Sequence, residues 1–122
     1  MTASSDGDKP FDLEERTLLF AKQIRAFFKK LPRSVANAED GRQLIRSSGS
    51  IGANYIEANE ALGKNDFLMR VRIARREAKE SVFFLRLLDT GADPSLQAER
   101  LALVKEADEL LRILCAIIRK RE

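Results

Sequence analysis

Apolar residues alternate in steps of four and three along four long stretches of this 122-residue chain. The first series consists of Leu13, Phe20, Ile24, Phe27 and Leu31, with Thr17 completing it. A mean spacing of 3.5 residues places such a series on one face of an α-helix and suits helices packed about 20° from antiparallel. The pattern therefore predicts an all-α fold, an up-down-up-down left-handed four-helix bundle.

The helix boundaries follow from capping and breaking residues. We expect helices over residues 12–31, 38–62, 65–88 and 94–120. Asp12 and Glu15 match a capping box at the first start, Leu62 closes the second apolar series, and Gly63 suits its C-terminal stop. Residues 1–10 are polar and are predicted to be a disordered tail. Residues 11–122 are then one bundle domain.

The composition argues against catalysis. The chain has no histidine, the commonest general base and metal ligand, and Cys115, its one cysteine, lies on an apolar series and is interpreted as core. Without histidine, Glu57 and Glu60 cannot form the usual di-metal motif of bundles. We expect no enzymatic activity, no cofactor and no metal. The lone cysteine fits a reducing cytoplasm, and neither a signal peptide nor a membrane span is recognisable.

The predicted third helix carries a basic stripe without an acid among its members: Arg72, Arg75, Arg76, Lys79 and Arg86. Arg42 and Arg46 of the second helix extend this patch if they lie nearby. Arginine suits phosphate geometry, so these seven residues are candidate nucleic-acid contacts. The alternative is an ordinary solvated face, helped by pairs such as Arg76 with Glu80. The net charge of +3 permits an anionic partner without requiring one.

Apolar residues also lie outside the core series. On the third helix they form a further stripe, with Glu77 and Glu80 among them. Together with two leucines of the first helix they are candidate subunit-interface residues: Leu18, Leu19, Met69, Ile73, Phe84 and Leu87. A bundle helix that stays monomeric needs only one apolar stripe, so the extra residues favour a homo-oligomer. The alternative is a wide core face with some exposed leucines.

Gly49 and Gly52 lie close together within the predicted second helix. Relative to alanine they destabilise a helix by about 2 kcal/mol together. Close approach of another helix explains them better than a phosphate-binding loop, because the preceding strand and the lysine of a P-loop are missing. Asn54 and Glu57 share one edge and need partners such as arginine if they are buried. The helix-packing signature comprises Ser47, Ser48, Gly49, Ser50, Gly52, Asn54 and Glu57.

The stretch from Arg46 to Ala58, RSSGSIGANYIEA, resembles the signature of the bacterial four helix bundle protein family, also called 23S rRNA intervening-sequence or S23 proteins. The segment Leu13–Thr17 with Phe20-Ala21 and Leu31-Pro32 resembles the family's first helix. Lys64–Phe67 and Glu77–Ser81 resemble its third. The resemblance is strong over residues 11–88. At Phe83-Phe84 many relatives carry an aromatic pair with tryptophan, which this chain lacks.

The resemblance implies a four-helix bundle that assembles as a homopentamer. The family includes accessory proteins of diversity-generating retroelements, which form basic, barrel-like pentamers that bind a reverse transcriptase and nucleic acid. Two functions therefore stay open. One is a nucleic-acid-associated accessory bundle with RNA or DNA and a protein partner such as a reverse transcriptase. The other is a protein–protein scaffold without a nucleic-acid role.

Overall fold

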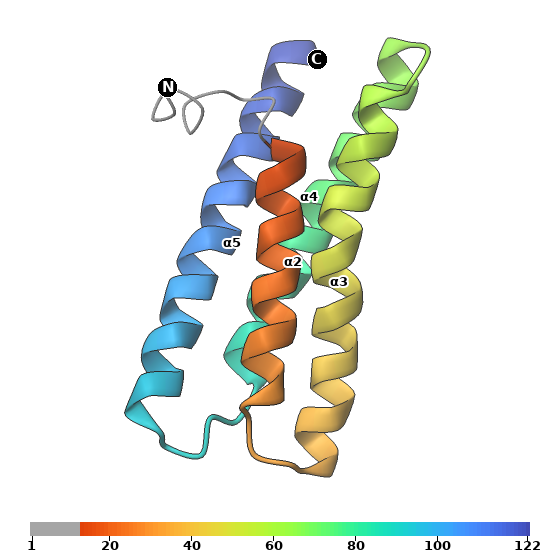
Figure 1. Ribbon diagram of the computed structural model, residues 1–122. Helices are drawn as coiled ribbons and strands as arrows, with labels where there is room; N and C mark the ends of the chain where they lie inside the picture. The colour runs from red at the N-terminus through yellow and green to blue at the C-terminus, as the bar shows by residue number, and fades with distance from the viewer. Residues whose placement is uncertain (1–12) are drawn as a thin grey trace.

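The computed structural model describes residues 13–122, which form four antiparallel helices (Figure 1). These are α2 (Leu13–Lys29), α3 (Val35–Asn59), α4 (Lys64–Leu87) and α5 (Pro94–Arg121). The chain runs down α2, up α3, down α4 and up α5, so the predicted all-α bundle with up-down-up-down topology is confirmed. The expected disordered tail over residues 1–10 and the proposed Asp12 cap lie outside the described residues.

The core is built from the residues that step by four and three. Its largest fully buried side chains come from all four helices: Phe20, Ile24, Phe27, Leu44, Ile51, Val71, Leu85, Leu110 and Leu114. Helices pack as neighbours in the pairs α2–α3, α3–α4, α4–α5 and α5–α2. The four helices thus form a closed ring around one core, and the α2/α3 seam lies opposite the α4/α5 seam (Figure 1).

α3 is displaced by three residues at each end relative to the predicted range 38–62. It starts at Val35 because the hydroxyl of Ser34 accepts a hydrogen bond from the backbone N–H of Asn37, at 3.0 Å. It ends at Asn59, so Leu62, expected to close the core series, lies fully exposed in the connection. Gly63 was expected to stop this helix; it instead occupies the N-cap position of α4.

The loop after α4 is stabilised by side chains from α3 and α5. The side-chain amide of Asn37, which is buried, donates to the carbonyls of Pro32 and Asp89, both at 2.9 Å. Arg100 of α5 donates to the Leu88 carbonyl near the C-terminus of α4. Asp93 caps α5, and its hydrogen bonds from Ser95 and Leu96 hold its pKa below the usual value.

Ion pairs join α2 to α5. Arg16 binds Glu106 through two hydrogen bonds of 2.7 and 2.9 Å, and this hydrogen bonding to Glu106 raises the pKa of Arg16 above its ordinary value. Lys30 binds Glu99 at 2.9 Å nearer the other end of α2. These contacts set the register of α2 against α5, and they leave its α3-facing side free of ion pairs within the described chain.

Candidate functional site

The basic stripe of α4 is partly neutralised by acids from other positions. The Arg72 guanidinium donates to Glu122, at 3.0 Å, and Arg76 lies 3.6 Å from a Glu77 oxygen. The prediction of a stripe free of acids is therefore wrong for these two residues. The helical wheel of α4 alone could not show the Arg72 pair, because Glu122 arrives from the end of α5. Both side chains of this pair are exposed, and such pairs contribute little to stability.

Three cations of the stripe have no acid within salt-bridge distance among residues 13–122: Arg75, Lys79 and Arg86. We call them the α4 cation row. Arg86 lines a shallow cleft of about 400 Å³ between α4 and α5, whose other lining residues are Gln97, Arg100, Leu101 and Val104. Helical periodicity places Arg75 and Lys79 on the same side of α4. The row therefore runs along the α5 side of α4.

Arg42 and Arg46 do not extend this row. Arg46 binds Glu80 at 2.9 Å and Glu77 at 3.4 Å, which places it at the α3/α4 seam on the other side of α4. Arg42 is exposed on α3. Arg46 and Arg76 both contact the Glu77 carboxylate, so Arg46 lies beside one member of the basic stripe but away from the α4 cation row, since α3 packs against the flank of α4 that carries Glu77 and Glu80. Glu80 consequently pairs with Arg46 and not, as expected, with Arg76.

Glu77 is buried, although the sequence pattern placed it on an exposed flank; only 5% of it is accessible. It lies where α3 covers α4, near a hydrogen bond of 2.9 Å between the hydroxyls of Ser47 and Ser81. Ser81 also donates to the Glu77 carbonyl. Arg46 and Arg76 compensate the buried carboxylate. This small polar layer joins α3 to α4 and explains Ser47 of the signature stretch as structural.

The remaining polar residues of the signature range from buried to exposed. Ser48 is buried and Ser50 half-buried. Asn54 donates to the Ser50 carbonyl at 2.9 Å and accepts from Arg70 at 3.4 Å, so an arginine partner is confirmed. Glu57 is exposed, so the condition of burial under which it would need a partner is not met. Its position on α3 points away from both neighbouring helices.

The glycines of α3 differ in what surrounds them. A Cβ atom placed on Gly52 lies 2.6 Å from the Thr17 hydroxyl oxygen of α2, which confirms Gly52 as a packing glycine. A Cβ on Gly49 meets only Arg25 Nη2, at 3.7 Å, an ordinary contact, so close packing within the chain does not explain Gly49. Gly41, which the signature does not include, is also a packing glycine, because a Cβ atom there would overlap the Phe28 ring of α2.

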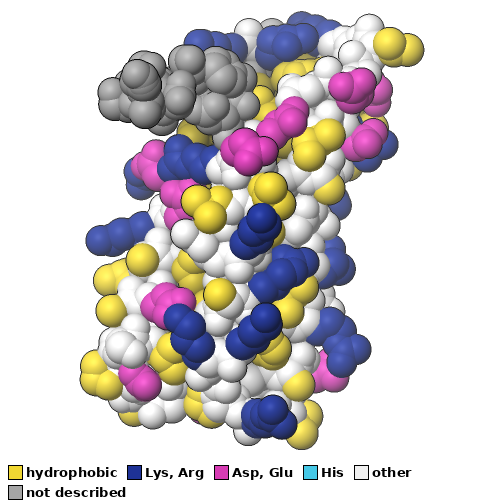
Figure 2. Space-filling model, in the orientation of Figure 1, with side chains coloured by type: hydrophobic (Ala, Val, Ile, Leu, Met, Phe, Trp, Pro, Cys, Tyr) yellow, Lys and Arg dark blue, Asp and Glu magenta, His cyan; other side chains and the backbone are white. Residues whose placement is uncertain are grey.

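A groove of about 520 Å³ follows the α2/α3 seam over the glycines. We call it the α2/α3 groove. Its lining is mostly apolar: Leu18, Ala21, Gly49, Gly52, Ala53 and Ile56, together with the buried Thr17. Lys22 and Arg25 line its α2 wall, and Glu14 lies at its end nearest the start of α2. Figure 2 shows this face, where Lys and Arg side chains predominate over the middle and lower parts and acids gather towards the top.

The candidate interface residues are only partly exposed as expected. Leu18, Leu19, Met69 and Leu87 are exposed, whereas Ile73 and Phe84 are half-buried. Phe84 packs against the core and contacts Phe83 edge to face, with 5.2 Å between ring centroids. The more exposed ring is Phe83, which is 59% accessible and was not among the predicted residues. Phe83, Leu87 and Met69 form what we call the α4 apolar ridge.

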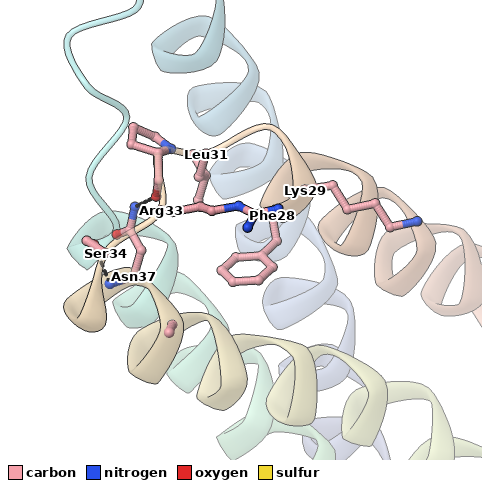
Figure 3. A pocket seen from close by; sticks show the side chains of 8 residues that line it. Phe28, Lys29, Leu31, Arg33, Ser34 and Asn37 are labelled. Carbon is pink, nitrogen blue, oxygen red and sulfur yellow. Dashed lines mark hydrogen bonds between the residues drawn. The ribbon is translucent and has the colours of Figure 1, made fainter.

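A second cavity of about 400 Å³ lies at the α2–α3 corner (Figure 3). Phe28, Leu31, Ser34 and Asn37 surround it, with Lys29 extending away along α2. The polar groups of Asn37 are engaged with the backbone at Pro32 and Asp89. The polar side chains of this corner therefore have structural roles, and we assign no ligand to it.

No group of three acidic or cysteine side chains in residues 13–122 is arranged to hold a metal ion. Cys115 is half-buried on α5 and not fully in the core as interpreted from sequence. None of the four described helices is long and apolar enough to cross a membrane.

Comparison with known proteins adds an independent line of argument. The sequence profile of the family described as 23S rRNA-intervening sequence protein matches residues 11–116. The chain belongs to this family. A crystal structure at 1.70 Å of a protein with unknown function from the S23 ribosomal protein family, from Bacteroides thetaiotaomicron VPI-5482, is similar to it. That similarity has a TM-score of 0.74 and 29% identity, covering 87% of this chain and 97% of the other. No curated protein matches.

Membership of the 23S rRNA-intervening sequence protein family confirms the resemblance carried by the α3 signature. The match extends through most of α5. In this helix the sequence resembles the family only in the spacing of its apolar residues. Two residues of the signature have structural roles in this family member. The Ser47 hydroxyl is hydrogen-bonded to the Ser81 hydroxyl, and the absence of a side chain at Gly52 leaves space for Thr17. Gly49 has no such internal role.

Proposed function

We propose that this member of the family is a non-enzymatic, self-associating module that binds nucleic-acid phosphates without sequence preference. We expect it to act in the cytoplasm. Its protein partner would be a nucleic-acid-processing protein such as a reverse transcriptase. The family resemblance favours a homopentamer. The α4 apolar ridge supplies the exposed surface that self-association would cover.

The observation that carries the nucleic-acid part is the α4 cation row. Arg75, Lys79 and Arg86 lie within a 12-residue segment of α4, whose ends are roughly 16 Å apart along the helix axis. No acid within the described chain neutralises them. Cations spaced along one helix side suit a phosphate backbone better than a compact anion. Repetition of the row in every subunit of an oligomer raises the avidity of individually weak contacts.

A protein–protein scaffold without a nucleic-acid role is the second candidate. The ion pairs of Arg46, Arg72 and Arg76 favour it, because they reduce the positive charge that the sequence pattern had assigned to α4. The two candidates share the fold and the self-association. They differ in whether the α4 cation row contacts a polyanion.

The distinguishing experiment is fluorescence anisotropy with a labelled single-stranded RNA of about 20 nucleotides at low salt. The double variant Arg75→Glu/Lys79→Glu should weaken binding by about tenfold or more, because it removes two phosphate contacts and adds repulsion. The control is Lys105→Glu/Arg112→Glu, which makes the same charge change at exposed positions of α5. Equal loss in both variants would show a net-charge effect and would contradict a role for the row.

A further inference from the structure

We propose that the α2/α3 groove is a docking site for an amphipathic helix of another protein, one that carries acidic residues beside its apolar face. Two large apolar side chains stand on opposite walls of this groove and remain accessible in the folded chain. Leu18 on α2 is 47% exposed and Ile56 on α3 is 43% exposed. With Ala21 and Ala53 between them they form a continuous apolar surface along the seam.

Gly49 points to an external ligand because nothing inside the chain requires it. Gly41 and Gly52 face Phe28 and Thr17 at distances that forbid a Cβ atom, whereas a Cβ at Gly49 makes only an ordinary contact with Arg25. A glycine in a helix interior is destabilising by about 1 kcal/mol relative to alanine. Without a side chain, Gly49 leaves the backbone of α3 uncovered in the groove lining, where the backbone of a docked helix can approach it.

The charges around the groove specify the chemistry of its occupant. Lys22 and Arg25 line the α2 wall, and neither forms a salt bridge with an acid of residues 13–122. Arg25 donates to the Ala21 carbonyl at 3.0 Å, which holds its guanidinium at the groove. The acid of the groove, Glu14, sits at one end and accepts from Asn59. A helix with glutamates or aspartates beside its apolar side complements this wall.

The dimensions suit a helix. The lining extends along α2 from Glu14 to Arg25, a segment of 12 residues whose ends are roughly 16 Å apart. Two to three turns of a docked helix cover that length, with apolar anchors at i, i+4 and i+7. The lining contains no aromatic ring on which a base could stack, and this disfavours single-stranded nucleic acid as the occupant.

A second copy of the chain is a poorer fit. On the opposite side of the bundle the exposed apolar residues Phe83, Leu87 and Leu101 lie near Arg86 and Arg100. Docking that side into the α2/α3 groove brings these arginines towards Lys22 and Arg25. Juxtaposed like charges oppose association. The groove and the α4 ridge therefore serve different partners.

The test uses two synthetic amphipathic peptides of about 18 residues with the same leucine and alanine anchors, one flanked by glutamates and one by lysines. The full-length protein should bind the acidic peptide about tenfold or more tightly than the basic one in fluorescence anisotropy. The variant Lys22→Glu/Arg25→Glu should reverse this preference. Lys105→Glu/Arg112→Glu, with the same charge change away from the groove, should keep it.

A second variant separates groove occupancy from charge. Gly49→Leu fills the groove without meeting a buried neighbour, so circular dichroism should remain that of the wild type while acidic-peptide binding weakens by about tenfold or more. In NMR spectra of the wild type, the amide signals of Gly49 and Ala53 should shift on peptide addition. The proposal would be overturned if Lys22→Glu/Arg25→Glu still preferred the acidic peptide, or if Gly49→Leu bound that peptide as tightly as the wild type. NMR signal shifts confined to α4 would also overturn it.

Two competition outcomes would assign the groove to another occupant and would also overturn the proposal. In one, a single-stranded RNA displaces the peptide. In the other, the peptide dissociates the wild-type oligomer. The RNA-binding residues lie on α4, whereas the peptide-binding residues lie on α2 and α3. RNA binding can therefore fail while peptide docking succeeds.

Discussion

Replacing Gly52 with leucine is expected to lower the free energy of unfolding by about 1–3 kcal/mol. The reason is the contact between α3 and α2. A Cβ atom on Gly52 lies 2.6 Å from the Thr17 hydroxyl oxygen and 3.1 Å from the Thr17 Cβ. Thr17 is buried and its hydroxyl donates to the Glu14 carbonyl, so it cannot move aside without losing that bond. Urea denaturation followed by circular dichroism measures the change.

Alanine substitutions at the three glycines of α3 provide the control. Gly49→Ala should raise the free energy of unfolding by up to about 1 kcal/mol, because alanine favours the helix and the added methyl group meets no clash. Gly41→Ala and Gly52→Ala should lower it, since Phe28 and Thr17 occupy the required space. A change of the same sign in all three variants would contradict the packing roles assigned to Gly41 and Gly52.

The double variant Phe83→Glu/Leu87→Glu should convert the proposed oligomer to a monomer of 13.8 kDa. Phe83 is 59% and Leu87 50% exposed in the single chain, so charges at these positions are tolerated by the folded bundle but not by an apolar subunit interface. Sedimentation velocity at micromolar concentration measures the mass, and circular dichroism checks that the helices persist. These exposed sites make a cleaner test than Ile73 or Phe84, which are half-buried.

Leu62→Glu serves as the matched control. Leu62 is fully exposed in the connection between α3 and α4, away from the α4 apolar ridge, and its substitution should leave the assembly intact. A wild-type protein that sediments as a monomer would remove the self-association proposal. If the Phe83→Glu/Leu87→Glu variant remained oligomeric, the subunit interface would lie on a surface other than the α4 apolar ridge.

The sequence predicted the fold because the four-and-three spacing is local to each helix. Leu44, Ile51 and Leu85 lie in the core as that spacing requires. The ends of α3 were displaced because polar residues carry no periodic signal there. Asn37 is buried and forms hydrogen bonds with the backbone of Asp89, 52 residues away, and a single-helix pattern does not contain that contact.

The candidate surfaces were less predictable because they depend on which helix faces which. Glu77 lies on a flank of α4 that looks exposed on a helical wheel, and only the position of α3 buries it. The same arrangement separates Arg46 from the α4 cation row. No sequence pattern marks Lys22, Arg25 or Ile56 as part of a binding surface. The packing of α2 on α3 brings these residues together in one groove. A comparison of the outward faces of α2 and α3 could have indicated the α2/α3 groove.

The salt dependence of RNA binding tests the central proposal most directly. Three phosphate contacts, at a slope of about −0.7 per contact for a single strand, predict that affinity falls about 20-fold when salt rises from about 50 to about 200 mM. The Arg75→Glu/Lys79→Glu variant should show a shallower slope as well as weaker binding. Anisotropy titrations of one labelled RNA across this range give both quantities. Absence of wild-type binding at the lowest salt, or an affinity independent of salt, would contradict the nucleic-acid role and favour the scaffold.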